Sequence, residues 1–214
     1  MKENKINLIL IAAIVGFIVF LIAVVVALSD NSEKTLQASS SSSDTGSHHQ
    51  AVAPDESRFN SLLGKKAPNF TLESFEGKTI ELDQLKGKKV VLFFTEGLMC
   101  YPACWNQMAA FGQDSAFNNP NVITLNIAVD NKNDWNEAVE KMPELAKAIV
   151  LFDSARSISQ EYGALTLPSS MHKGQYLGHT YVIVDRQGIV RFIYDDPLMG
   201  VRNDELKKEL VKIE

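Results

Sequence analysis

The chain has 214 residues, of which 45% are hydrophobic and 22% charged, and its formal net charge at pH 7 is −5. A nucleic-acid-binding surface needs clustered basic residues, so this balance argues against nucleic acid as a partner. The hydrophobic residues are unevenly distributed along the chain, and this divides it into three parts.

The first part, residues 1–28, contains an apolar run over residues 8–28 that no charged side chain interrupts. A helix of that length, at ~1.5 Å per residue, spans the ~30 Å hydrocarbon core of a bilayer, which predicts one transmembrane anchor. Lys2 and Lys5 precede the run, and acidic residues follow it. The positive-inside rule therefore predicts a cytoplasmic N-terminus and a domain outside the cell membrane. The alternative is a cleaved signal peptide, whose apolar region usually covers only about 7–15 residues.

The second part, residues 29–57, is rich in serine and almost free of large apolar side chains. Such a segment buries too little surface to offset the entropy of ordering it, so we expect a flexible tether. The third part, residues 58–214, has the length of one globular domain.

The domain alternates expected strands with expected helices. The apolar run over residues 90–94 is typical of a strand covered on both faces. Asp134 is expected to cap a helix that Pro143 distorts, and residues 185–188 are expected to form the turn of a hairpin. In chain order, we expect strands over residues 79–82, 90–94, 121–129, 149–152, 180–184 and 189–193, and helices over residues 102–112, 134–148 and 203–213. This order predicts a three-layer α/β/α sandwich with a mixed sheet.

The chain has two cysteines, Cys100 and Cys104, at the junction of the expected strand 90–94 and the helix after it. Residues four apart on a helix have Cα atoms about 6 Å apart, within the usual range for a disulfide. A helix N-terminus stabilises a thiolate and lowers its pKa below the ordinary value of about 8.5. We therefore predict that Cys100 is the exposed nucleophile and Cys104 the resolving thiol of a redox pair.

Two other interpretations of the pair stay open. One is a structural disulfide in an oxidising compartment, although a loop this short restrains little unfolded-chain entropy. The other is a scaffold that kept the fold without catalysis.

Several segments resemble the redoxin branch of the thioredoxin superfamily, which holds alkyl hydroperoxide reductase-type peroxiredoxins and membrane-anchored thiol–disulfide oxidoreductases. These segments are residues 64–72, 82–85, 87–94, 162–163, 178–185 and 188–191. The resemblance covers about residues 63–213 and implies a thioredoxin-like fold and a thiol-based enzyme without a cofactor. It also implies protein or small-molecule thiols and disulfides as partners, with peroxides and an antioxidant role as the variant.

The sequence departs from that branch at three points. Three residues separate the cysteines, where thioredoxin-like reductases have two. Peroxiredoxins carry a Pro seven and a Thr three residues before the reactive cysteine, and here Phe93 and Gly97 hold those positions before Cys100. His179 stands in the slot where thioredoxins place a cis-proline.

His179 also supports an alternative from another class. Sco-type copper assembly proteins resemble this chain in having an anchored thioredoxin-like domain, two cysteines separated by three residues and a distant histidine. Thiolates and imidazole suit copper, so this alternative assigns copper to Cys100, Cys104 and His179. Met99 and Met171 are further soft donors in this interpretation.

Three more residues are candidates for proton transfer or substrate contact alongside His179. Tyr101 and Trp105 flank the cysteines and are expected to shape the substrate surface. Glu96 is a candidate proton-transfer acid, although an exposed loop position is the simpler expectation for it. The resulting hypothesis is a membrane-anchored, extracytoplasmic thiol–disulfide oxidoreductase, with the copper-binding assembly protein as the alternative.

Overall fold

The structure is a computed structural model that describes residues 52–213. The predicted cytoplasmic tip, the membrane anchor and most of the predicted tether lie outside the described residues. Among residues 52–213, no helix combines the length and the apolar character needed to cross a membrane.

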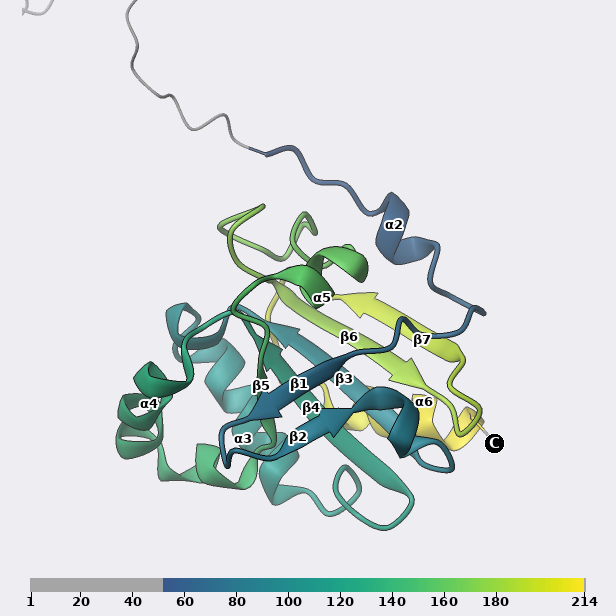
Figure 1. Ribbon diagram of the computed structural model, residues 1–214, viewed down its shortest axis with the longest axis horizontal. Helices are drawn as coiled ribbons and strands as arrows, with labels where there is room; N and C mark the ends of the chain where they lie inside the picture. Colours follow the sequence, from purple (N-terminus) through teal and green to yellow (C-terminus); the bar gives the residue numbers. More distant parts are fainter. Residues whose placement is uncertain (1–51, 214) are drawn as a thin grey trace, which may run out of the picture. The chain divides into compact units, whose positions relative to one another are not determined.

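A seven-stranded mixed sheet forms the centre of the domain, with the strand order β2-β1-β5-β4-β3-β6-β7 (Figure 1). Strands β3, β4 and β5 run parallel to one another, and the other neighbouring pairs are antiparallel. The strands are β1 (Thr71–Ser74), β2 (Thr79–Glu81), β3 (Lys89–Thr95), β4 (Val122–Ala128), β5 (Val150–Phe152), β6 (His179–Val184) and β7 (Val190–Asp195). The predicted mixed sheet and the predicted hairpin β6–β7 are confirmed.

Strand β3 lies inside the sheet, and its side chains alternate between two apolar clusters. Val90, Leu92 and Phe94 belong to one cluster, and Val91 and Phe93 belong to the other. Successive side chains of a strand point to opposite faces, so a strand covered on both faces needs apolar residues at every position. Burial on both faces of the sheet therefore explains the uninterrupted apolar run over residues 90–94.

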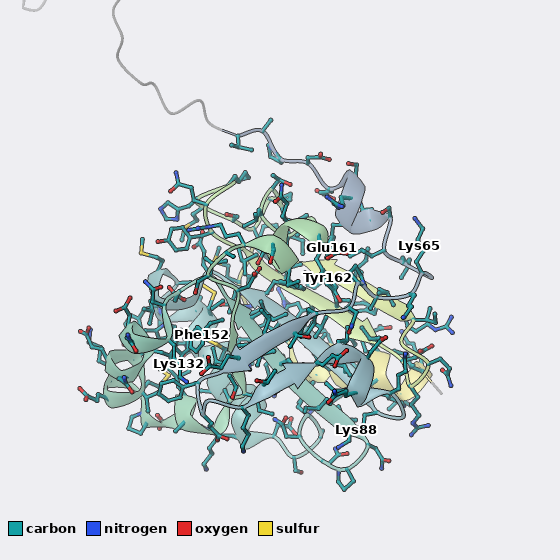
Figure 2. All side chains as sticks on the ribbon, viewed as in Figure 1. Lys65, Lys88, Lys132, Phe152, Glu161 and Tyr162 are labelled. Atoms are coloured by element: carbon teal, nitrogen blue, oxygen red, sulfur yellow. A yellow bond between two sulfur atoms is a disulfide. The ribbon has the colours of Figure 1, made fainter. Side chains whose placement is uncertain are left out.

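Helices cover both faces of the sheet and complete the three predicted layers. The α-helices are α2 (Ser57–Asn60), α3 (Ala103–Gln113), α4 (Trp135–Lys141), α5 (Ser157–Glu161) and α6 (Asn203–Lys212), and the 3₁₀ helices are η2 (Leu82–Leu85), η3 (Gly97–Met99), η4 (Lys132–Asp134) and η5 (Pro143–Lys147). Helices α3, α4 and α6 pack in the cluster that contains Phe93, whereas α2 and α5 pack in the other. Figure 2 shows Tyr162, which is buried beside α5, and Lys65 and Lys88 at the periphery.

The single helix expected over residues 134–148 is wrong in two respects. Helix α4 ends at Lys141, and a separate 3₁₀ helix starts at Pro143. Met142 has φ −138° and ψ 87° because the ring of a proline disfavours helical geometry in the residue before it. Asp134 precedes α4, but its side chain makes no capping hydrogen bond.

The folded domain includes a few residues of the predicted tether. The backbone N–H of Asp55 donates to the carbonyl of Thr166 at 2.9 Å, and the Thr166 hydroxyl donates to the Asp55 carbonyl at 2.8 Å. Contacts with the domain therefore begin before residue 58.

Candidate redox site

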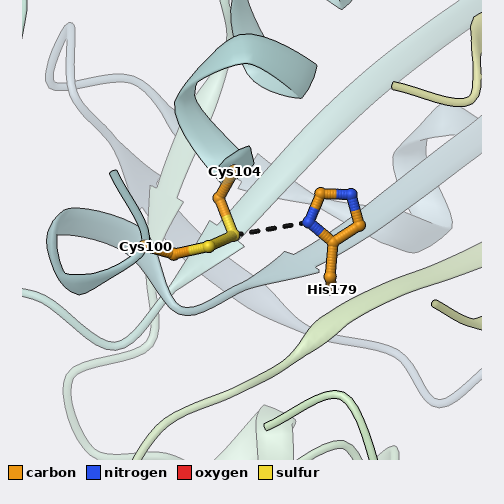
Figure 3. A group of neighbouring side chains, drawn as sticks. All are labelled: Cys100, Cys104 and His179. Carbon is orange, nitrogen blue, oxygen red and sulfur yellow. Dashed lines mark hydrogen bonds between the residues drawn. A yellow bond between two sulfur atoms is a disulfide. The ribbon is translucent and has the colours of Figure 1, made fainter. Parts of the chain in front are cut away.

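The two cysteines are bonded to each other where the chain passes from β3 to α3. Cys100 follows η3, and Cys104 is the second residue of α3; their Cα atoms lie 5.4 Å apart (Figure 3). The backbone N–H of Cys104 donates to the carbonyl of Cys100 at 3.0 Å, so the helical hydrogen-bond pattern already starts at Cys100. The disulfide that the four-residue spacing allows is formed.

Both cysteines are nearly inaccessible to solvent in this disulfide state. Cys100 is 3% exposed and Cys104 is 0% exposed, so the predicted exposure of Cys100 is wrong here. Its neighbours Met99 and Tyr101 are 52% and 65% exposed. Cys100 turns inward instead and packs in the apolar cluster under α3. Exposed residues nonetheless flank Cys100 on both sides in the chain.

Strand pairing brings His179 to the disulfide from the far side of the sequence. His179 is the first residue of β6 and lies opposite Thr95, the last residue of β3. Its Nδ1 atom is 3.4 Å from Cys104 Sγ (Figure 3). The donor atoms of Cys100, Cys104 and His179 all lie within 4.8 Å of one another. The structure thus joins the three residues that the sequence singled out.

The His179 ring is buried, and its second nitrogen is also bonded. Nε2 lies 2.8 Å from the Tyr181 hydroxyl and 3.1 Å from the Gly200 carbonyl. Burial lowers the pKa of His179 from 6.5 to about 4, because removal from water disfavours the charged imidazolium. The Gly200 carbonyl and Asp196 oppose this shift only in part. The imidazole is therefore neutral at pH 7.

The carboxylate of Asp196 holds the loop of residues 198–202 beside the disulfide. Asp196 accepts hydrogen bonds from the backbone N–H groups of Leu198 (3.1 Å) and Gly200 (3.0 Å), and from Nε (2.7 Å) and Nη2 (3.0 Å) of Arg202. The loop so held carries Met199, whose Sδ lies 3.9 Å from Cys100 Sγ. The sequence offered one signal for this turn, the Asp196-Pro197 pair, but nothing in it pointed to Met199.

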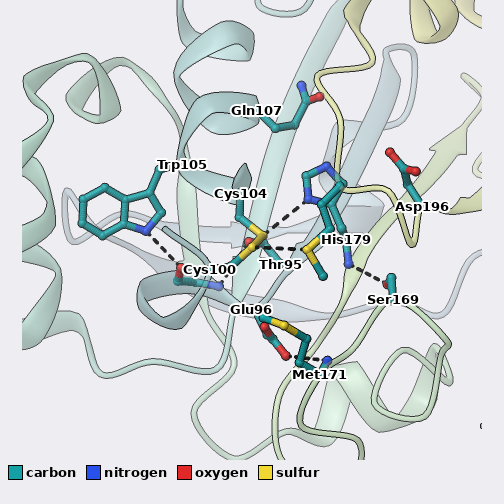
Figure 4. Close-up of a disulfide and its surroundings, with 12 residues drawn as sticks. Thr95, Glu96, Cys100, Cys104, Trp105, Gln107, Ser169, Met171, His179 and Asp196 are labelled. Atoms are coloured by element: carbon teal, nitrogen blue, oxygen red, sulfur yellow. Dashed lines mark hydrogen bonds between the residues drawn. A yellow bond between two sulfur atoms is a disulfide. The ribbon is translucent and has the colours of Figure 1, made fainter. Parts of the chain in front are cut away.

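A second loop fixes the start of β6. The Ser169 hydroxyl accepts the backbone N–H of His179 at 2.7 Å, and the Ser169 N–H donates to Asp195 at 2.9 Å. A Cβ atom on Gly178 would lie 1.8 Å from Ser169 Oγ and 2.7 Å from the backbone nitrogen of Ser170. Glycine is thus the residue that lets this loop approach β6 so closely. Figure 4 shows Ser169, His179 and Asp196 around the disulfide.

The remaining predicted site residues have different surroundings. Glu96 is fully buried, which corrects the expectation of an exposed loop position. Its Oε1 accepts the N–H groups of Met171 (2.9 Å) and His172 (3.2 Å), and its Oε2 has no hydrogen-bond partner among the described residues. Trp105 is buried and donates its ring N–H to the Gly97 carbonyl at 3.0 Å, which fastens η3 to α3. Of these three residues Tyr101 is the exposed one, and its ring and that of Trp105 form a T-shaped pair with centroids 5.0 Å apart.

These observations define a thioredoxin-like α/β protein with a Cys–x–x–x–Cys disulfide between a strand and a helix and a histidine against the second sulfur. Residues 63–193 match the AhpC/TSA family. The chain belongs to that family, so the predicted resemblance to the redoxin branch is confirmed. A thiol-based redox enzyme is the class of protein that this membership supports.

Similar proteins agree with the family assignment. The chain is 31% identical over 140 residues to a chloroplastic peroxiredoxin Q of Triticum aestivum and 28% identical over 143 residues to a putative peroxiredoxin bcp of Coxiella burnetii. Each match covers 62% of this chain. The first covers 58% of the wheat protein, and the second covers 87% of the Coxiella protein. The chain thus spans less than two thirds of the wheat protein. Among solved structures, reduced 2-Cys peroxiredoxin of Plasmodium vivax has a TM-score of 0.58 and 27% identity, covering 71% of this chain and 95% of that one.

The depressed pKa of His179 predicts a pH-dependent stability. An unfolded histidine binds a proton below pH 6.5, whereas the folded protein protonates His179 only near pH 4. Unfolding therefore takes up a proton in this window, and the stability from the neutral ring is complete above pH 6.5 and lost as pH falls toward 4. We expect the wild type to lose about 3 kcal/mol relative to His179→Gln over that range. Calorimetry of both oxidised proteins from pH 4 to 7 measures this difference, and a pH-independent difference would contradict it.

Proposed function

We propose that this chain is a thiol–disulfide oxidoreductase whose Cys100–Cys104 pair cycles between dithiol and disulfide. The observation that carries the proposal is the disulfide itself, formed at the start of α3 with the imidazole of His179 against Cys104. Oxidised protein or small-molecule thiols are the proposed substrates. The family of the chain and the peroxiredoxin names of its relatives support thiol-based chemistry.

The proposed cycle starts with the thiolate of Cys100. Helix α3 starts just after Cys100, and the partial positive charge at its N-terminus stabilises this thiolate. The thiolate attacks one sulfur of the partner's disulfide, which forms a mixed disulfide and releases one partner thiolate. Cys104 then gives its proton to Nδ1 of His179 and attacks Cys100 Sγ. This second step forms the Cys100–Cys104 bond and releases the other partner sulfur, which takes up the proton.

Peroxide reduction is the variant within the same class. Cys100 would take the terminal oxygen of a hydroperoxide, forming a sulfenic acid and an alcohol, and Cys104 would displace water to form the disulfide. Phe93 is buried in the core under α3, so the position seven residues before Cys100 contributes no contact to a bound peroxide. We therefore place disulfide exchange first.

Single cysteine variants separate the two proposed roles. Cys100→Ser is expected to abolish turnover, because it removes the nucleophile. Cys104→Ser is expected to retain the attack and accumulate the mixed disulfide, because no thiol resolves it. Mass spectrometry of each reduced variant after exposure to a small disulfide detects the adduct. Full turnover by Cys100→Ser would refute the proposal, and an adduct on Cys100→Ser alone would exchange the two roles.

A second candidate function has a specific observation in its favour. The sulfur atoms of Cys100 and Cys104 and the imidazole of His179 lie within 4.8 Å of one another, and the thioether of Met199 lies 3.9 Å from Cys100 Sγ. Reduction of the disulfide would make both sulfur atoms available as ligands. Thiolate, thioether and imidazole donors suit Cu(I). Met99 and Met171, the methionines considered from the sequence, are exposed.

Competition with a Cu(I) chelator tests this second candidate. The reduced full chain is expected to bind one Cu(I) tightly if it handles copper, with a large loss in His179→Ala and a smaller one in Met199→Leu, which conserves volume. Anaerobic titration measures both losses. Binding that is weak or indifferent to His179 would remove this candidate and leave the redox cycle.

We also propose that residues 8–28 anchor the protein with its domain outside the cytoplasm, on the support of the apolar run and the lysines before it. The full chain is expected to stay with membranes after alkaline carbonate extraction. Protease added to intact cells is expected to degrade the domain. Recovery of the full chain in the carbonate supernatant would refute the anchor.

A further inference from the structure

We infer that Gln107 and Tyr181 are positioning residues that hold His179 as the Nε2–H tautomer, with an unprotonated Nδ1 aimed at Cys104. The inference rests on the proposed function, in which Nδ1 receives the proton of Cys104. It follows from a series of hydrogen bonds that starts on α6 and ends at the disulfide. In this series the orientation of each side chain determines which atom of the next one donates.

The chain of assignments starts at Asn203, the first residue of α6. Its Nδ2 atom lies 3.2 Å from the carbonyl of Ala110 and 3.3 Å from Oδ2 of Asp114. A carbonyl and an ionised carboxylate only accept hydrogen bonds, and Asp114 is ion-paired with Lys207. The amide NH₂ of Asn203 must face them, so its Oδ1 faces Gln107.

Gln107 is oriented from both ends of its amide. Its Nε2 donates to Asn203 Oδ1 at 2.9 Å, and its Oε1 accepts the backbone N–H of Arg202 at 2.7 Å. A backbone N–H can only donate, so the two contacts independently give the same orientation. Gln107 is fully buried, so bulk solvent does not compete for its amide.

Tyr181 transmits this orientation to the imidazole. Its hydroxyl donates to Gln107 Oε1 at 2.9 Å, which is nearer than its other acceptor, the Gly200 carbonyl at 3.4 Å. A phenol has a single proton, so toward His179 the oxygen acts as an acceptor for Nε2–H at 2.8 Å. The Tyr181 ring is stacked on Phe93 with centroids 4.9 Å apart, which holds the hydroxyl in place.

The Gly200 carbonyl adds a second acceptor at Nε2, 3.1 Å away. The opposite tautomer would set the lone pair of Nε2 against that carbonyl and point an N–H at Cys104 Sγ. With Nε2–H in place, the lone pair of Nδ1 faces the sulfur at 3.4 Å. The partners of Nε2–H are the Tyr181 hydroxyl and the Gly200 carbonyl, and neither group removes its proton. The proton that Nδ1 receives therefore leaves from the same nitrogen, to the departing thiolate of the partner.

Nitrogen NMR of the ¹⁵N-histidine-labelled full chain reads the tautomer directly, and the His179 signal is identified by its loss in His179→Gln. In the wild type we expect a protonated type of shift for Nε2 and an unprotonated type for Nδ1. In Gln107→Met the Tyr181 hydroxyl loses its nearer acceptor and keeps the Gly200 carbonyl at 3.4 Å, whereas His179 Nε2 lies only 2.8 Å away. We therefore expect the Tyr181 proton to turn to Nε2 and the tautomer to shift toward Nδ1–H. Tyr181→Phe keeps the Gly200 acceptor and is expected to keep the wild-type tautomer.

The double variant Gln107→Met/Tyr181→Phe separates positioning from packing. It lacks the hydroxyl that would misdirect the ring, so we expect the Nε2–H tautomer to return, whereas a packing role would make it worse than either single variant. A chromogenic aromatic disulfide reports the two chemical steps as successive equivalents of released thiolate. Loss of base assistance is expected to slow the second equivalent at least about tenfold in Gln107→Met, with recovery in the double variant.

An Nδ1–H tautomer in the wild type would overturn the inference, and so would an unchanged tautomer in Gln107→Met or a double variant as slow as Gln107→Met. The tautomer is measured without turnover, so failure of the proposed function is distinct: release of the second equivalent would then persist unchanged in Cys104→Ser.

Discussion

The antiparallel pairing of β3 with β6 is the constraint on which the site depends. Thr95 and His179 lie opposite each other at the end of that ladder, and beyond Thr95 the chain turns through η3 to Cys100. A shift of one residue in register would move His179 to the other face of the sheet, away from α3 and Cys104. Strand β3 is apolar on both faces, so its own pattern does not fix this register; the observed pairs run from Val90–Val184 to Thr95–His179.

The site beside this strand pairing is buried, and few charged groups lie near the disulfide. The imidazole is neutral because it is buried, and the carboxylate of Asp196 is held away in an ion pair with Arg202. In the proposed cycle this neutral imidazole is the base that accepts the proton of Cys104 after a partner has bound to Cys100. Met99 and Tyr101, on either side of Cys100 in the chain, are exposed.

The same donor atoms suit thiol exchange and soft-metal binding, and both uses start from the reduced form. Formation of the Cys100–Cys104 bond consumes both thiolates, so a metal could bind only the reduced form. In both chemistries Nδ1 of His179 must carry a lone pair toward the sulfur atoms. The network through Tyr181 and Gln107 thus serves either use of the site, and the difference between them lies in what meets Cys100 first.

Local pattern determined much of the fold and part of the site. The apolar run of β3, the helix after the cysteines and the hairpin β6–β7 follow from side-chain periodicity and turn residues, which act over a few positions of the chain. The same local rules made the disulfide between Cys100 and Cys104 geometrically available. The break of the expected helix at Met142 also follows from the sequence, because Pro143 acts on the residue before it.

Tertiary structure alone decided what surrounds the disulfide. The burial of Cys100, the thioether of Met199, the buried carboxylate of Glu96 and the tautomer of His179 all depend on segments that are far apart in the chain. Sequence identifies Gln107 as one polar residue of an apolar helix, and only packing against α6 and β6 gives its amide a direction. The physical reason is that periodicity reports which face of an element is buried, whereas hydrogen-bond partners are set by strand order and register between distant segments.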